Sequence, residues 1–315
     1  MGDAPLTRSR TTHTPPHEPL TEGPAPVSVD RQHIEWLGTL PFLGVHLACL
    51  LVFWTGISPV AVAIAATTLL LRMFGLTAGY HRYFCHRAFK TTRAFQFVLA
   101  SLGAAAAQMG PLWWAGHHRS HHRHSDTHAD VHPPSVKGFF FAHAGWIMSR
   151  ENKPTKMEWV RDFAKFPELR WLDRNHYIAP IALGIALFAL GAWLQRVHPA
   201  LGTSGGQLVV VALFWSTTAL YHLTFAVNSL GHLYGSRRYD TDDESRNLWW
   251  LALITAGEGW HNNHHRYPAS ERQGFYWWEC DVTHYAVVVL DWLGIVWDVR
   301  GPAPAVLEEG LREET

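Results

Sequence analysis

Histidine side chains are gathered in three short stretches of this chain, which we call the first, second and third boxes. The second and third boxes both read H-x2-H-H, a spacing that places three imidazoles on one face of a helix. Imidazole nitrogen is a ligand for iron, copper, zinc and nickel. Eight clustered histidines exceed the needs of one ordinary metal site, so the pattern predicts a centre with two metal ions. The predicted ligands are His81 and His86 in the first box, His118, His121 and His122 in the second, and His261, His264 and His265 in the third.

The rest of the sequence excludes several other kinds of chemistry. The formal net charge is zero, so no excess of basic residues points to a nucleic acid partner. The three cysteines, Cys49, Cys85 and Cys280, are widely separated and match neither an iron–sulfur nor a disulfide pattern. The sequence also has no haem motif and no G-x-G-x-x-G dinucleotide motif. A redox reaction at the histidines would therefore need electrons from a separate protein.

Four apolar segments are long enough to cross a membrane as helices, which takes about 20 mostly apolar residues. The connections within each pair of segments are short, so both termini and the long segment 81–177 share one side of the membrane. That segment carries an excess of Lys and Arg, which predicts that it lies in the cytoplasm. All three boxes then reach the cytoplasmic face of a multi-pass protein, which we place in the bacterial cytoplasmic membrane. The predicted spans are residues 37–55, 60–78, 178–194 and 208–230.

The predicted fold class is an all-α membrane protein, in which four transmembrane helices carry a cytoplasmic helical cap that holds a histidine-rich di-metal centre. Two further apolar stretches, residues 95–114 and 248–256, are expected to form helices on the bilayer surface or over the site. Residues 1–33, rich in Pro, Thr and charge, are expected to form a disordered tail. The membrane domain then covers residues 34–300, and residues 301–315 form a second loose tail.

Several stretches around the boxes resemble integral-membrane fatty acid desaturases of the acyl-CoA Δ9 (stearoyl-CoA) type, in a bacterial form. The resemblance extends over residues 37–300 and is most specific at residues 77–82, 118–122, 125–130, 138–146 and 257–265. It implies an O2-dependent desaturase that introduces a cis double bond at Δ9 into a saturated long-chain fatty acyl substrate. It also implies two Fe2+ ions, O2 as co-substrate, and an external electron donor such as a ferredoxin, or a cytochrome with its reductase.

The resemblance also implies roles for residues outside the boxes. His232 would be a ninth metal ligand, and Asn228 would hold a metal-bound water. Gln108, Trp114 and Thr224 would line the bend of a tunnel for the acyl chain. A bent tunnel fixes which carbons face the metals and imposes a cis product, which is catalysis by positioning.

The end of the second span is expected to carry both a ligand and the floor of that tunnel. His81 faces the metals there, and Met73 and Leu69 lie eight and twelve residues earlier, near the same face of the helix. We therefore expect Met73, and after it Leu69, to close the tunnel and set the chain length, as this part of the span does in the family. Residues i and i+5 diverge on a regular α-helix, so we also expect the helix to end between His81 and His86.

The sequence leaves the acyl carrier and the final reaction open. Gly116 and His117 stand where animal acyl-CoA enzymes have Arg and Asp, so coenzyme A, acyl carrier protein and membrane lipid all stay open as carriers. A membrane hydroxylase of lipid, alkane or carotenoid would use the same three boxes. A metal transporter or storage protein fits less well, because its ligands would follow a path through the membrane instead of gathering on one face.

Other histidines lie close to the boxes or inside the spans, and ligating imidazoles need oriented partners. We expect Asp126, Asp130 and Glu258 to be such partners. His46 and His222, inside the spans, are expected to be buried hydrogen-bonding residues and not ligands. The roles that stay open are those of His117, His124, His128, His132 and His143.

Overall fold

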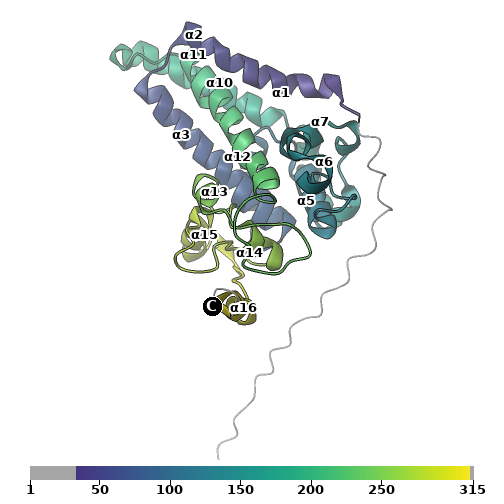
Figure 1. The fold of residues 1–315 in the computed structure, drawn as a ribbon. Helices are drawn as coiled ribbons and strands as arrows, with labels where there is room; N and C mark the ends of the chain where they lie inside the picture. The colour runs from purple at the N-terminus through teal and green to yellow at the C-terminus, as the bar shows by residue number, and fades with distance from the viewer. Residues whose placement is uncertain (1–32, 313–315) are drawn as a thin grey trace, which may run out of the picture.

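The computed structural model describes residues 33–312, and nearly all of its regular structure is helical (Figure 1). Within that range two short strands, β1 (Lys90–Thr91) and β2 (Val296–Trp297), pair antiparallel. The helical fold class predicted from the sequence is therefore confirmed. The predicted N-terminal tail lies outside the described residues except for His33.

Four helices are long and apolar enough to cross a membrane, as predicted, and the fourth packs against each of the other three. They cover Trp36–Thr55, Pro59–Cys85, Ile178–Val197 and Gly205–Leu230. The second is longer than predicted, because the helix continues into the first box. Many outward side chains are apolar and exposed, for example Leu47, Phe53 and Ile185. Such a surface matches lipid better than water, so these features indicate membrane association.

Three of the four spans are assembled from consecutive helical pieces, and the third is a single helix. The first contains α1 (Trp36–Ala48), η2 (Cys49–Leu51) and α2 (Val52–Thr55); the second contains α3 (Pro59–Phe74) and η3 (Gly75–Cys85); the third is α10 (Ile178–Val197); the fourth contains α11 (Gly205–Gln207), η8 (Leu208–Trp215) and α12 (Ser216–Leu230). A three-residue helix, η7 (Pro199–Leu201), lies between the third and fourth spans.

The tight turn between the first two spans follows from its residues. Gly56 has a φ of +69°, a left-handed conformation that glycine adopts without a steric penalty. Ser58 then caps α3, because its hydroxyl accepts a hydrogen bond from the Ala61 backbone N–H at 3.1 Å. Pro59 occupies the first turn, where its missing N–H costs nothing. The chain therefore reverses direction between the first two spans, and both pack against the fourth span.

A buried arginine joins the second span to the fourth. The Arg72 side chain is 2 % exposed, and its guanidinium donates to the hydroxyls of Ser216 at 2.5 Å and Thr217 at 2.6 Å. It also donates to the Thr68 carbonyl at 3.1 Å. A charged side chain inside a membrane bundle is costly unless its donors are satisfied. Arg72 therefore fixes α3 against α12 just above the histidine boxes.

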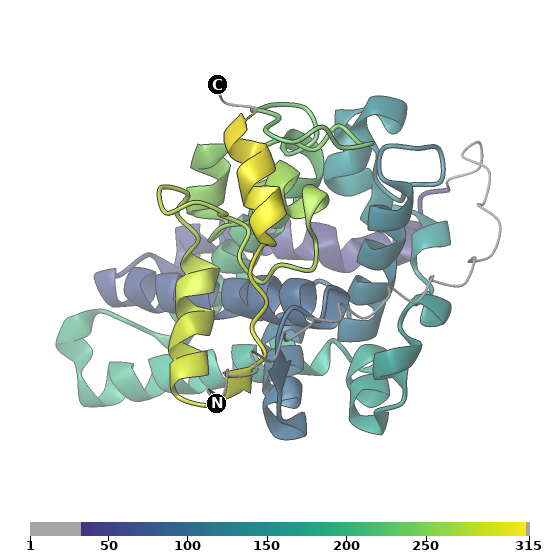
Figure 2. The same cartoon turned by 90° about the horizontal axis from the view of Figure 1, so that it is seen from below.

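A cap of shorter helices lies over the ends of α3 and α12 and contains most of the box histidines (Figures 1 and 2). Between the second and third spans the cap contains α4 (Arg93–Ala104), α5 (Pro111–His124), α6 (Pro134–Lys137), η4 (Phe141–Gly145), α7 (Trp146–Met148), η5 (Arg150–Asn152), η6 (Met157–Trp159), α8 (Arg161–Ala164) and α9 (Pro167–Arg174). After the fourth span it contains α13 (Trp249–Ile254), α14 (His261–Arg266), α15 (Val282–Trp292) and α16 (Pro304–Arg312).

The two ambiguous apolar stretches are short helices of this cap. The first becomes α4 and the beginning of α5, and α4 packs tightly on η3, where a Cβ on Gly75 would lie 2.5 Å from the Gly103 nitrogen. The second becomes α13. Helices α13 and α15 expose large apolar side chains, including Trp249, Leu253 and Trp292. Exposed tryptophans on short helices beside the spans are typical of the membrane interface.

The C-terminal residues are more ordered than the predicted loose tail. Helix α16 buries Val306 against the cap, where it is 6 % exposed (Figure 2). The Tyr239 hydroxyl donates to the Val306 carbonyl at 3.0 Å, and the Tyr276 hydroxyl donates to the Leu307 carbonyl at 2.8 Å. The acidic composition suggested a solvated segment, but these two buried hydroxyls need acceptors and the helix supplies them.

Candidate metal centre

The nine predicted histidine ligands lie together in two adjacent groups. Within each group, the nitrogen atoms available to a metal all lie within 4.8 Å of one another. The second box lies on α5 and the third on α14, and each of these helices contributes histidines to both groups. The first group contains His81, His86, His118, His122 and His264, and the second group contains His121, His232, His261 and His265.

The first box uses a backbone that the sequence analysis did not expect. The helix ends at Cys85, immediately before His86, and its last part, Gly75–Cys85, forms a π-helix with His86 as its C-cap residue. A π-helix has i→i+5 hydrogen bonds, so its wider turn brings residues five apart onto one face. The His86 backbone N–H donates to the His81 carbonyl at 3.3 Å, and the two ring centroids are 4.9 Å apart. The helix therefore ends between the two histidines as expected, and the π-helical turn, which was not expected, brings them together.

Asp173 fixes the start of α5, the helix that carries the second box. Its carboxylate accepts hydrogen bonds from the backbone N–H groups of Leu112 at 2.9 Å and Trp113 at 2.8 Å, which have no partner within the helix. Gly110 allows this approach, since a Cβ there would lie 2.3 Å from the Asp173 carboxylate.

Asparagines fix the third box on the short helix α14. The Asn247 side-chain oxygen accepts from the backbone N–H groups of Asn262 at 3.0 Å and Asn263 at 3.1 Å, which caps the helix. Asn262 in turn donates to the Tyr239 carbonyl at 3.0 Å, and Asn263 donates to the Glu279 carboxylate at 2.8 Å. The two residues inside H-N-N-H-H therefore hold the helix while its histidines face the site.

Four of the ligand histidines donate Nδ1–H to a carboxylate, which points Nε2 into the site. Asp130 contacts His121 at 2.9 Å, and Glu258 contacts His81. Asp126 and Asp243 complete the set, at 2.7 Å from His232 and 2.5 Å from His265 respectively. The sequence analysis named Asp126, Asp130 and Glu258 but missed Asp243, because no spacing rule separates it from Asp242 in the acidic stretch 240–244.

The electrostatics keep these carboxylates charged and most of the imidazoles neutral. Burial opposes ionisation of Asp130, but the neighbouring His121 outweighs it and holds the pKa of Asp130 below its ordinary value. Burial also opposes ionisation of Asp126, and there the hydrogen bond from His232 lowers the pKa. Neutral imidazole is the form that binds a metal. Burial, aided by neighbouring histidines, holds the pKa values of His86, His118, His122, His261 and His264 well below the ordinary value.

The positions of the Nε2 atoms fit bound cations better than hydrogen bonds. Nε2 of His118 lies 3.0 Å from Nε2 of both His86 and His122, and Nε2 of His264 lies 2.9 Å from that of His122 and 3.0 Å from that of His81. A ring nitrogen carries either a hydrogen or a lone pair, so one nitrogen cannot satisfy two such contacts. A metal ion accepts all the lone pairs at once. The donor set, imidazole without thiolate, therefore fits transition-metal ions.

A buried ion-pair network holds the first box against the C-terminal part of the cap. The Arg82 side chain donates to Asp281 at 2.9 Å, to Glu258 at 3.1 Å and to Glu271 at 3.2 Å. Glu258 and His261 form an E-x2-H sequence, a motif that soluble di-iron bundles use in pairs. Glu258 contacts Arg82 and His81 instead of joining either group of ligand atoms. Arg82 therefore fixes the carboxylate that orients a ligand.

The histidines with open roles lie outside the two groups. His132 is buried with its ring centroid 4.2 Å from that of His121, and with Asp130 it forms a third, smaller cluster that shares His121. His117 contacts the Pro154 carbonyl at 3.2 Å, and His124 contacts the Ser120 carbonyl at 3.0 Å. His128 is exposed in the loop that follows α5.

His143 extends a chain of imidazoles along the outside of the bundle. Its Nε2 lies 3.0 Å from His222, and His222 lies 3.1 Å from His46. His46 also contacts the Phe42 carbonyl at 2.7 Å. His46 and His222 form hydrogen bonds inside the spans as expected, but His222 is exposed, so the expectation that both residues are buried was wrong.

Three neighbouring cavities share lining residues and lie beside the first histidine group. The largest, of about 470 Å³, lies between α1, α7 and the start of α10 and is lined by Gln108 and Trp114. A cavity of about 20 Å³ shares both residues and adds His118 and Thr224, and one of about 40 Å³ shares Trp114, His118 and Thr224. Gln108 donates to the Thr224 hydroxyl at 3.1 Å, and Trp114 stacks on His118.

The cavity of about 40 Å³, which we call the inner cavity, ends at the second span. Met73 and Leu76 line it, together with Asn228, which borders both small cavities beside the histidines. Leu69 lies one turn further along α3 and does not line this cavity. The predicted substrate residues other than Leu69 therefore follow one path.

Comparison with known proteins decides which reaction this site belongs to. The sequence model described as fatty acid desaturase matches residues 57–288. The chain belongs to the fatty acid desaturase family. It is 34 % identical over 284 residues to the sn-2 palmitoyl-lipid 9-desaturase of Nostoc sp. (strain 36), covering 89 % of this chain and 95 % of the relative. It is 38 % identical over 276 residues to the sn-1 stearoyl-lipid 9-desaturase of Anabaena variabilis, covering 86 % and 95 %.

The predicted family is thus confirmed, and the protein is a fatty acyl desaturase, an oxidoreductase. A further relative is the chloroplastic palmitoyl-monogalactosyldiacylglycerol delta-7 desaturase of Arabidopsis thaliana, 36 % identical over 273 residues, covering 84 % of this chain and 68 % of that relative. The names of these three desaturases specify acyl lipids, whereas the sequence resemblance pointed to the acyl-CoA type.

The carboxylate that the sequence analysis missed gives a test of the metal centre. Asp243→Asn removes the charge that orients His265, and we expect roughly 10- to 100-fold weaker metal binding, the usual effect of losing such a partner. The matched control is Asp242→Asn, because Asp242 is exposed on the same loop. Competition between purified protein and a chelator measures the affinity. Equal affinities for the two variants would contradict the role given to Asp243.

Proposed function

We propose that this desaturase inserts a cis double bond at Δ9 of a saturated long-chain acyl group carried by a membrane lipid, using two iron ions and O2. The names of the two cyanobacterial relatives, both lipid 9-desaturases, support the position and the carrier. The observation that carries the proposal is that the cavities of the acyl path reach the histidine ligands. Trp114, His118 and Thr224 line both small cavities, so a chain threaded along them would pass the first histidine group.

The two histidine groups are proposed to hold one ion each, with Asn228 reaching an ion through a water molecule. Iron bound there would supply the activation of O2 that removal of hydrogen from an unactivated C–H bond requires. Over the whole reaction, two hydrogens leave adjacent carbons, and O2 takes them up with two external electrons and two protons to give two water molecules. The remaining task of the protein is to hold the chain and exclude water.

The bend in the path is proposed to set the stereochemistry. The hydrogen bond between Gln108 and Thr224 spans the path, and Trp114 is held in place by its stacking on His118. A saturated chain can pass this bend only in a kinked conformation, which places two neighbouring carbons beside the ligands and leads to a cis product. Holding the reacting carbons in that conformation lowers the barrier by positioning.

Electrons are proposed to come from a separate donor, a ferredoxin or a cytochrome with its reductase. The sequence has no redox motif other than the histidine boxes. The excess of Lys and Arg in residues 81–177 supports a cytoplasmic position for the cap, the metal centre and both termini. The donor would then dock on the cytoplasmic face of the bacterial membrane.

Expression in a desaturase-deficient host tests the function directly. Mass spectrometry of the cellular fatty acids should find new monounsaturated chains with the double bond at carbon 9. His121→Ala should abolish the product while the protein still inserts, because the spans do not depend on the metal. His128→Ala changes an exposed histidine in the loop that follows α5, and as the matched control it should keep activity. Hydroxylated chains without desaturation would support the hydroxylase alternative and contradict this proposal.

The inner end of the path gives a prediction about chain length. Met73 is 3 % exposed and lines the inner cavity, so Met73→Ala should lengthen the path. We expect preference to shift toward longer chains, by roughly tenfold per added methylene pair, with the double bond at the same carbon from the carboxyl end. Leu70→Ala is the control, because Leu70 is 61 % exposed on the same helix. Competition assays with a series of acyl chain lengths measure the shift. An unchanged preference would mean that Met73 only packs within the bundle and does not set the chain length.

A further inference from the structure

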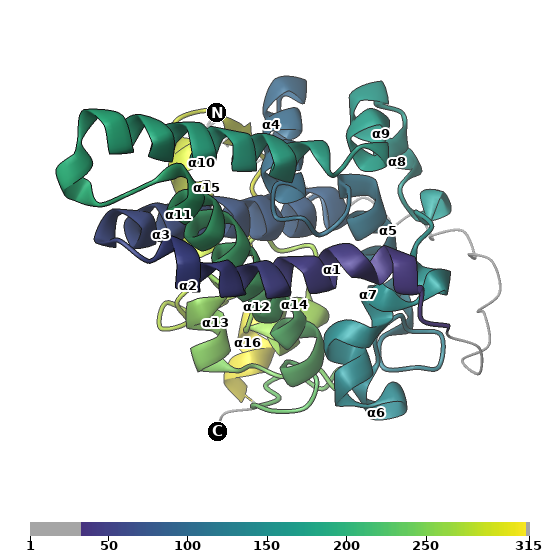
Figure 3. The same ribbon diagram turned by 90° about the horizontal axis from the view of Figure 1, so that it is seen from above.

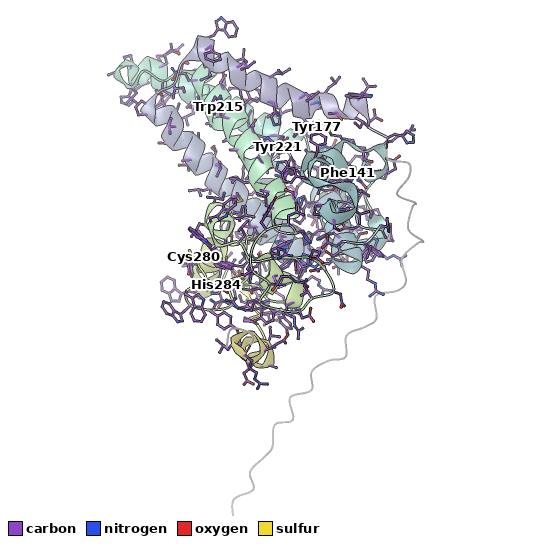
Figure 4. All side chains as sticks on the ribbon, in the orientation of Figure 1. Phe141, Tyr177, Trp215, Tyr221, Cys280 and His284 are labelled. Carbon is purple, nitrogen blue, oxygen red and sulfur yellow. The ribbon has the colours of Figure 1, made fainter. Side chains whose placement is uncertain are left out.

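The cavity of about 470 Å³ opens sideways, between two helices that are long and apolar enough to span the membrane. Its exposed lining residues are Gly38 and Pro41 on α1, and Tyr177 and Ile181 at the start of α10. We call these four residues the mouth. Figure 4 labels Tyr177 and Tyr221, which line the cavity below α1. The cavity is therefore open toward the surroundings of the spans, and not only toward the cap.

The surroundings of the mouth are apolar on both helices. On α1, Leu37, Leu40 and Leu43 are 77 %, 57 % and 42 % exposed, and on α10 Ile185 and Phe188 are 66 % and 56 % exposed. Side chains of this kind on a membrane span face lipid chains. A ligand that approaches the mouth from this side would arrive from within the bilayer.

The position of the mouth along the spans is close to the membrane surface. Residues 38–41 lie in the first turns of α1, and residues 177–181 lie at the beginning of α10, so both sides of the mouth are at the cap end of their helices (Figure 3). This is the depth at which the glycerol backbone of a lipid meets its acyl chains. The cavity then leads inward, past Gln108 and Trp114, to the histidine groups.

The charge at the mouth matches a lipid headgroup better than coenzyme A. Among the residues that line the cavity, Lys153 is the only Lys or Arg. Its ammonium lies 3.3 Å from the Gly38 carbonyl, at the rim, while its stem lines the apolar wall. A lysine in this position reaches the interface and attracts a headgroup with a net negative charge. Coenzyme A carries several phosphates and would call for a cluster of cations.

We propose that the substrate acyl chain enters sideways from the bilayer through the mouth, while the headgroup of its anionic phospholipid stays at the interface beside Lys153. This inference rests on the proposed function and adds the route and the lipid class. The carboxyl end of the chain stays at the rim, so the path from the mouth to the histidines decides which carbons reach them. Met73, at the other end, affects only the total length of chain that fits.

Photo-crosslinking tests the route without any need for turnover. The metal-loaded protein is reconstituted in vesicles that contain a phosphatidylglycerol with a diazirine near the carboxyl end of one saturated chain. Irradiation should label peptides that contain residues 38–45 and 177–181. Ile181→Trp should reduce this labelling at least severalfold, because the larger ring fills the mouth. Ile185→Trp, one turn away on the same exposed face of α10, should leave it unchanged.

The headgroup contact has its own control. Lys153→Gln should reduce labelling by phosphatidylglycerol but not by the matching phosphatidylcholine, whereas Lys165→Gln, an exposed lysine of the cap, should change neither. Equal labelling in Ile181→Trp and Ile185→Trp, or labelling confined to other peptides, would contradict entry of the acyl chain through the mouth. If the wild-type protein desaturates palmitoyl-CoA but no vesicle phospholipid, the proposed desaturation stands and the sideways route is wrong. Loss of cellular desaturation in Ile181→Trp but not in Ile185→Trp would support the route.

Discussion

The structure depends on bringing nine imidazoles with their lone pairs into one buried space. The Nε2 atoms of His118 and His264 each lie about 3 Å from two other Nε2 atoms, an arrangement that neutral rings cannot satisfy among themselves. Cations between the rings would accept these lone pairs, with oriented partners behind the rings. Carboxylates supply that orientation for four rings, and backbone contacts and asparagines fix the helices that carry the others. The cap is built around this requirement, and its helices are accordingly short.

The membrane bundle and the metal centre are coupled through the second span. Arg72 ties this helix to the fourth span within the bundle, and ten residues later Arg82 ties it to three carboxylates of the cap. Between the two arginines, the helix widens into its π-form and passes the inner cavity at Leu76 and Thr77. One continuous helix thus positions the floor of the acyl path, a ligand histidine and the network that orients it. A shift of this helix would change all three together.

The parts that sequence could predict are those governed by regular spacing or by long apolar runs. Four spans followed from length and composition, and the nine histidines followed from the repeated boxes and from a family resemblance. The π-helix did not follow, because its wider turn depends on packing against α4 and not on local composition. Asp243 was missed because tertiary contact alone separates it from Asp242, and α16 because its order comes from the buried hydroxyls of Tyr239 and Tyr276. The division of the second and third boxes between the two histidine groups likewise depends on how η3, α5 and α14 pack together.

The central claim is that this chain binds two metal ions through histidine nitrogen. The most direct measurement is the metal content of protein purified from iron-supplemented cells, combined with X-ray absorption at the iron edge. The account predicts two iron ions per chain with a nitrogen-dominated first coordination shell. One ion per chain, or a shell dominated by carboxylate oxygen, would contradict it, because either result would require ligands other than the two histidine groups.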